Sequence, residues 1–279
     1  MNFNSIINNL NDISKQLFQT VEDEVYKTLD KITSIKVDIL NEEPLKQLFN
    51  QSSENGIILI ANSLILFFIT YYIFTQLISL LNGDKSENIY LFIFKVIIIT
   101  LLINNSYFIC RTILDLNEKL EDIVSWYGKD VAGKEVSFSN LKQRITNIQD
   151  FLNTDLISLD GIIKGVISFG SITILINFSI RYVLIIILIF LFPIAISICL
   201  SKNTIPMFFN YLKTLITLLL MGSIVKIIMI LPMVYKDIDS TMYKIILVGS
   251  IYVIYKLNFY VKEMFMNINL NKTRRSLFE

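Results

Sequence analysis

The stretch that decides the fold lies in the second half of the chain, where residues 161–200 read GIIKGVISFGSITILINFSIRYVLIIILIFLFPIAISICL. This sequence is almost continuously apolar and carries only two charged side chains, Lys164 and Arg181. As one helix it would be about 60 Å long, twice the hydrocarbon thickness of a bilayer. We therefore expect either two spans that meet near residues 177–181, or one helix that projects out of the membrane.

The whole chain carries the same membrane signal. Of its 279 residues, 53% are hydrophobic and 18% are charged, whereas soluble domains have about 45–50% and about 25%. The mean hydropathy of +0.58 is therefore high. Because the excess is concentrated in a few long runs, it argues against a soluble globular enzyme.

Further apolar runs lie outward from the central one, at 57–81, 89–110, 207–231 and 244–261. Each is long enough to be read as a helical span. We predict an all-α polytopic membrane protein with five or six transmembrane helices: a first hairpin over 57–111 and a bundle over 161–262. Pro193 and Pro206 are candidate helix kinks, because proline removes a backbone donor.

Three polar segments complete the chain. Residues 1–56 place apolar side chains three or four positions apart, from Ile6 to Ile39, which predicts one long amphipathic helix. Residues 112–160 predict a helical insert whose first helix carries an apolar stripe and ends in a loop around Lys129 and Asp130. In the second helix of the insert, Asn140 is the expected cap. A basic tail occupies 263–279. The stripe of the insert comprises Ile113, Leu116, Leu120, Ile123 and Tyr127.

Charge suggests the topology. The basic tail places the C-terminus in the cytoplasm by the positive-inside rule. Six spans would then put the N-terminal segment and the insert inside, and five would put both outside. The insert and the arginine that immediately precedes it carry six cations, which favours six spans: Arg111, Lys119, Lys129, Lys134, Lys142 and Arg144.

The sequence offers no catalytic, metal or cofactor site, so we expect a protein that is not an enzyme. It contains no histidine, which removes His-dependent triads and His-bound zinc. Cys110 and Cys199 are far apart, and no disulfide is expected. The intramembrane lysines at 95, 164, 226 and 256 are expected to reach the headgroups from helix ends. Arg181 is the exception and is a candidate lumen or subunit contact, unless a loop lies there.

Residues 180–220 resemble one known family. Ile180-Arg181-Tyr182-Val183, an Ile/Leu run and Phe192-Pro193-Ile194-Ala195 are similar to the TrbL-type membrane channel subunits of type IV secretion systems. The family's polar link and entry to the next span correspond here to residues 204–212. The order of elements over 60–279 is also similar. The family usually has five spans with its N-terminus and insert outside, which differs from the charge count above.

This resemblance implies a channel or scaffold subunit in the cytoplasmic membrane. Several copies would form part of a passive conduit for a DNA–protein substrate, without stable sequence-specific nucleic-acid binding. The expected partners are the lipid bilayer, further copies of the chain, and other secretion-system subunits including separate ATPases. A small-solute permease or exporter component is the alternative, which would need a site at the bilayer midplane. A holin-like pore ranks third.

Overall fold

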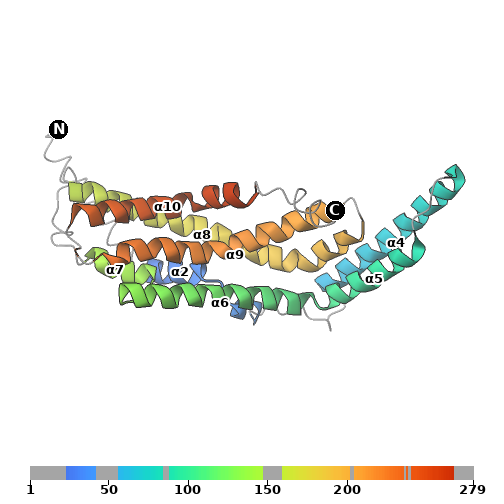
Figure 1. Ribbon diagram of the computed structural model, residues 1–279, viewed down its shortest axis with the longest axis horizontal. Coiled ribbons are helices and arrows are strands. Elements are labelled where there is room, and N and C mark those ends of the chain that lie inside the picture. Colours follow the sequence, from blue (N-terminus) through green and yellow to red (C-terminus); the bar gives the residue numbers. More distant parts are fainter. Residues whose placement is uncertain are drawn as a thin grey trace. The chain divides into compact units, whose positions relative to one another are not determined.

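In the computed structural model, the described residues are 23–41, 56–83, 88–146, 159–201, 204–235, 237 and 240–266. They form helices joined by turns, with no strand among them, so the predicted all-α class is confirmed for this part of the chain (Figure 1). The chain divides into two compact units. Unit 1 comprises Met1–Ile35, Asn117–Val183 and Thr217–Glu279, and unit 2 comprises Lys36–Leu116 and Leu184–Ile216.

Three of the described helices are long and apolar enough to cross a membrane. They are α4 (Ile57–Asn82), α8 (Leu159–Ser197) and α9 (Ile205–Val234). The candidate span of α8 begins at Phe169 and ends at Leu200, in the short 3₁₀ helix η2 (Ile198–Leu200) that follows it. A fourth span results if α5 (Ile89–Asn104) and α6 (Ser106–Ala132), bent by 63°, count as one. The last helix, α10 (Thr241–Met266), is not among these. The protein therefore has apolar helices suited to a membrane.

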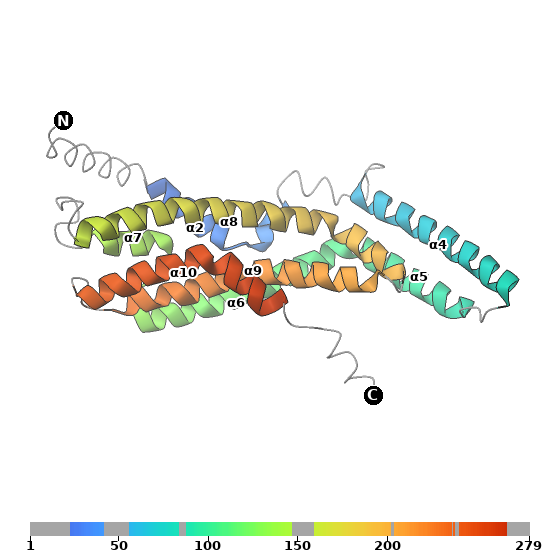
Figure 2. The ribbon, with the colours of Figure 1, turned by 90° about the horizontal axis from the view of Figure 1, so that it is seen from above.

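The long apolar run folds as one uninterrupted helix. Figure 2 shows α8 as a continuous coil, so the turn near residues 177–181 that two spans would require is absent. Pro193 lies inside this helix, which nevertheless continues to Ser197. Pro206 is the second residue of α9. In a first turn the missing N–H would have no acceptor within the helix, so Pro206 begins a helix and does not kink one.

Unit 1 contains two short helices that pack against each other. The helix α2 (Asp23–Thr33) lies against α7 (Phe138–Thr146), and Tyr26 and Leu29 of α2 are buried. The predicted single helix up to Ile39 is wrong, because α2 ends at Thr33 and a separate 3₁₀ helix, η1, covers Val37–Asn41. Residues 1–22, the first half of the predicted stripe, lie outside the described residues, as does nearly all of the basic tail.

Unit 2 contains a helical hairpin. The helices α4 and α5 pack together, and Tyr72 stacks on Phe92 with ring centroids 3.6 Å apart. Gly83 ends α4 in the left-handed conformation at φ 72°, which glycine adopts without steric cost. The 3₁₀ helix η2 (Ile198–Leu200) contacts both helices. The predicted second span from Ile89 to Cys110 is not one straight helix, since α5 ends at Asn104 and α6 begins at Ser106.

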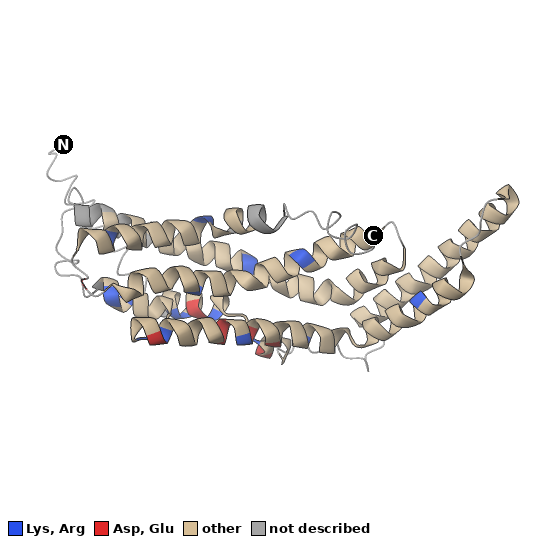
Figure 3. Ribbon diagram, in the orientation of Figure 1, with Lys and Arg blue, Asp and Glu red and all other residues tan. Residues whose placement is uncertain are grey.

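The helix α6 turns its predicted apolar stripe outward. Figure 3 shows acidic residues on α2 and α6 and none on α4. Leu120 and Ile123 of the stripe are 46% and 62% exposed, whereas Asn117 and Glu121 beside the stripe are buried. The helix continues through the expected loop at residues 129–130 and ends at Ala132. This helix therefore exposes its apolar stripe together with several charged residues, and it buries Asn117 and Glu121 in the core.

Candidate functional site

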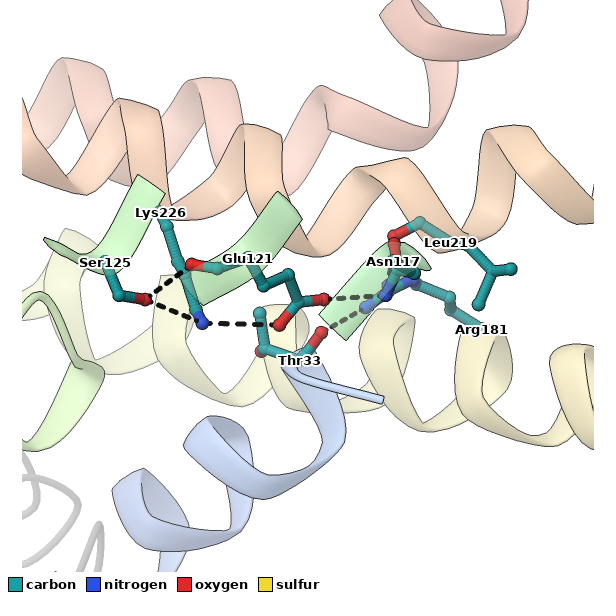
Figure 4. A network of polar contacts seen from close by, with 7 residues as sticks. All are labelled: Thr33, Asn117, Glu121, Ser125, Arg181, Leu219 and Lys226. Atoms are coloured by element: carbon teal, nitrogen blue, oxygen red, sulfur yellow. Dashed lines mark hydrogen bonds and ion pairs between the residues drawn. The ribbon is translucent and has the colours of Figure 1, made fainter. Parts of the chain in front are cut away.

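A network of polar side chains is buried inside unit 1 (Figure 4). It joins four helices: the end of α2, the middle of α6, the middle of α8 and the second half of α9. Its charged members are Glu121, Arg181 and Lys226, of which Glu121 and Arg181 are only 3% and 2% exposed. Charges this deep are rare unless they are paired or hydrogen-bonded.

Arg181 binds backbone carbonyl groups rather than a carboxylate. Its guanidinium donates from Nε to Leu218 O at 2.7 Å and from Nη2 to Leu219 O at 3.2 Å, both on α9. Nη1 donates to Thr33 O at 2.9 Å, at the C-terminal end of α2. A cation is favourable there, because the helix dipole is negative at that end. The planar fork of arginine thus links three helices at one point.

Glu121 forms the acidic centre of the network. Its Oε2 lies 3.2 Å from Nζ of Lys226, and its Oε1 accepts a 3.1 Å hydrogen bond from Asn117 Nδ2. Lys226 also donates to Ser125 Oγ at 3.1 Å. Because Lys226 lies inside the long apolar helix α9, the ion pair lets that helix keep a charge away from water.

Gly222 makes the close approach of these helices possible. A Cβ atom at this position would lie 2.6 Å from Thr33 O and 2.5 Å from Glu121 Oε1. Real Cβ atoms do not come this close to other atoms, so α2 and α6 can reach α9 only where α9 has no side chain. Glycine here serves packing, in a helix that contains no other glycine.

Some polar atoms of the network remain without a partner among the described residues. The buried hydroxyl Oγ1 of Thr33 neither donates nor accepts a hydrogen bond, and the buried amide oxygen Oδ1 of Asn117 accepts none. Both residues take part in the network through other atoms, as Figure 4 shows. Such groups in protein interiors are commonly satisfied by buried water.

Two further helix ends in unit 1 are capped by charges from other helices. Asp30 on α2 accepts hydrogen bonds from the Phe138 and Ser139 amides at 2.6 and 3.1 Å, and from the Ser139 hydroxyl at 2.7 Å. Arg144 on α7 donates to the carbonyl groups of Pro232 and Tyr235 at the end of α9. Each charge has the sign that the helix dipole favours.

Burial and hydrogen bonding act in opposite directions on Asp30. Burial raises the pKa of this carboxyl group and outweighs the hydrogen bonds from Ser139 and Phe138, which lower it. The predicted cap, Asn140, is not the residue that caps α7. Its own amide donates to Ser137 Oγ at 3.1 Å, so Ser137 caps the helix together with Asp30.

The residues singled out from the sequence lie in different surroundings. Arg181 is held inside the chain, and its contact with a lumen or another subunit stays a prediction. Cys110 and Cys199 are both free, as expected. Lys226 pairs with Glu121 instead of reaching the headgroups. That pair was not predicted from the sequence, although a lysine within an apolar helix signals the need for a buried acid.

This arrangement can fix the register of four helices, because each polar contact is satisfied in only one alignment.

Comparisons of the chain with protein-family models, with curated proteins and with solved structures gave no match.

Proposed function

We propose that this protein is an integral membrane channel or scaffold subunit of a conjugative type IV secretion system, contributing to the conduit for a DNA–protein substrate across the cytoplasmic membrane. The single observation that carries the proposal is the apolar stripe that α6 exposes. This helix is rich in charged residues, and Leu116, Leu120, Ile123 and Tyr127 of its stripe are exposed, whereas Asn117 and Glu121 are buried. A stripe of that kind is suited to packing against another protein helix.

The apolar helices support the membrane part of the proposal. Only 22% of the most apolar window of α4 is buried, and its exposed side chains are predominantly apolar. Lipid tails would solvate such a surface. The resemblance of residues 180–195 and 204–212 to TrbL-type subunits supplies the secretion-system part.

We place five spans in this proposal. We count the three long helices, the bent α5–α6 pair and, in addition, the less apolar α10, and the unbroken α8 supports counting that helix once rather than twice. With the basic tail inside, the insert would lie outside. Lys129 is exposed on α6, so a Lys129→Cys variant tests this topology. An impermeant thiol reagent should label it in intact cells, and labelling only after lysis would contradict five spans.

A transfer assay tests the function itself. Deletion of the gene should abolish plasmid transfer to a recipient and leave solute uptake unchanged, and the full-length gene in trans should restore transfer. Normal transfer frequency in the deletion strain would refute the proposal. A companion strain with Leu120→Asp should transfer poorly while retaining the protein in the membrane, because a charge on the stripe opposes subunit packing.

A small-solute permease or exporter component is the second candidate. The observation in its favour is the 63° break between α5 and α6 at Asn105, because discontinuous helices form the substrate sites of many transporters. Loss of uptake or export of a solute in the deletion strain, with normal plasmid transfer, would favour this candidate.

A further inference from the structure

A cleft in unit 2 lies between the helices of the hairpin. It has a volume of about 690 Å³ and is lined by α4 from Phe68 to Ser79, by α5 with its cap from Asn88 to Ile98, and by Leu200 and Ser201. This volume is within the range of small-molecule sites. Along each helix the lining covers about 16 Å, at about 1.5 Å per residue.

The cleft contains one cation in an otherwise apolar helix. Lys95 is the only charged residue of α5 and lines the cleft. It is half-buried and has no ion-pair or hydrogen-bond partner among the described residues, and no Asp or Glu lines the cleft. An unpaired ammonium group on a helix of this kind is costly in hydrocarbon, so an anion is the partner that the site lacks.

The remaining walls suit an acyl chain. Tyr72 and Phe92 stack face to face, while Phe68 and Ile98 line the cleft farther along the two helices. Gln76, also in the lining, has no hydrogen-bond partner among the described residues and can accept or donate one. The cleft therefore combines a cation, a free amide and an aromatic wall, which together match an amphiphile with an anionic headgroup.

The depth of Lys95 fits a lipid headgroup. It lies six residues after the first residue of α5, or about 9 Å along the helix axis. A lysine side chain at that depth reaches the headgroup region by extending along the helix.

We infer that this cleft binds an anionic phospholipid, with the headgroup at Lys95 and Gln76 and an acyl chain along the aromatic wall. Basic pockets between transmembrane helices are known to bind such headgroups. This site is independent of the proposed function, since a channel subunit and a permease could both carry it.

Photolabelling of the purified full-length chain in detergent micelles tests the inference. The two probes are phosphatidylglycerol and phosphatidylcholine with the same diazirine-bearing acyl chain. Peptides covering residues 68–98 should take up about fivefold more of the anionic probe, the factor that one basic residue contributes to attraction of an anionic lipid. Equal labelling by both probes would overturn the inference, because it would mean that the hairpin is merely exposed to lipid.

Variants separate a specific site from general exposure. Lys95→Gln should reduce labelling by phosphatidylglycerol to the level of phosphatidylcholine, and Lys95→Arg should preserve the preference. Lys129→Gln, a loss of charge at an exposed position on α6, is the matched control and should change nothing. Unchanged preference in Lys95→Gln would overturn the inference.

A second variant keeps the test valid if Lys95→Gln does not fold. Ile98→Trp retains the charge and fills the cleft, so it should lose the preference for the anionic probe while its helical circular dichroism stays intact. If Ile98→Trp folds and still prefers phosphatidylglycerol, the lipid does not occupy the cleft. Cross-linking of Gln76→Cys to a second copy in native membranes would likewise assign the cleft to protein and overturn the inference.

Discussion

Arg181 on α8 and Thr33 at the end of α2 are joined by a 2.9 Å hydrogen bond from Nη1 to the carbonyl oxygen, although 148 positions separate them in the sequence. The same guanidinium holds two carbonyl groups of α9. This one side chain therefore connects the N-terminal part of the chain to the long helices of unit 1.

The first prediction concerns the shape of that side chain. In Arg181→Lys the charge remains, but an ammonium group cannot reach three carbonyl oxygens on two other helices. Each lost hydrogen bond to a charged group costs about 1.5–3 kcal/mol, so the melting temperature in detergent should fall by several degrees. Arg111→Lys on the exposed face of α6 is the control and should melt like the wild type. An unchanged melting temperature in Arg181→Lys would mean that the network does not hold α2.

The second prediction uses two glycines in helices. Gly222→Ala places a methyl group against the Thr33 carbonyl and Glu121, and such overpacking costs about 1–3 kcal/mol. Gly249→Ala on α10 meets no described atom within 4 Å and should be neutral or stabilising, since alanine favours helices by about 1 kcal/mol. Thermal unfolding of both variants, followed by circular dichroism, measures the contrast. Equal effects would refute the close approach at Gly222.

The third prediction is a double-mutant cycle on Glu121 and Lys226. Removing one partner leaves a buried charge alone, so Glu121→Gln and Lys226→Met should each destabilise the protein by about 3–5 kcal/mol. The double variant should be more stable than the sum of the single effects implies. Strictly additive effects in chemical unfolding would show that the two side chains do not interact in the membrane protein.

The fourth prediction concerns pH and Asp30. Because its pKa is raised in the folded protein, the folded state binds this proton more tightly than the unfolded chain does. Stability from this group is therefore greatest below the ordinary pKa of aspartate, about 3.9, and declines as pH rises through the raised value. The stability advantage of wild type over Asp30→Asn should shrink across that window in thermal unfolding at stepped pH. If the stability advantage of wild type over Asp30→Asn grows with pH instead, the pKa of Asp30 is lowered in the folded protein and the prediction is wrong.

A related variant extends this test. The Ser139 hydroxyl group donates to Asp30 and lowers its pKa. In Ser139→Ala the pKa should therefore rise further, and the decline in stability should extend to higher pH.

The fifth prediction tests the stripe on α6 as a subunit contact. Ile123→Cys should form cross-linked dimers in native membranes with a short bifunctional reagent, because apolar faces pack against each other. Asp122→Cys, which is equally exposed but lies about 100° away around the helix, should cross-link much less. Comparable cross-linking at both positions would indicate random collision.

The apolar helices could be predicted well from the sequence, because their length and hydropathy are local properties. Residues 57–81 became α4 with boundaries shifted by a single residue. Apolar periodicity also located α2 and α6, although it did not give their ends.

The direction of the α6 stripe could not be predicted in this way. Periodicity identifies an apolar face, and burying that face is the usual outcome. Here the buried face carries Glu121, because Lys226 on α9 supplies the opposite charge across 105 positions of sequence. Only the three-dimensional pairing makes burial of that acid favourable, so a reading of one helix at a time assigns the wrong face.

The division of unit 1 into three separate stretches of chain has a consequence for biogenesis. Arg181 and Gly222, which meet Thr33, lie in the later stretches Asn117–Val183 and Thr217–Glu279. The stretch that contains α2 is therefore synthesised before the residues that hold it. Until Arg181 has been added, 148 positions after Thr33, no guanidinium caps the end of α2. The hairpin at 57–111 is made within this interval, before α2 can complete its contacts.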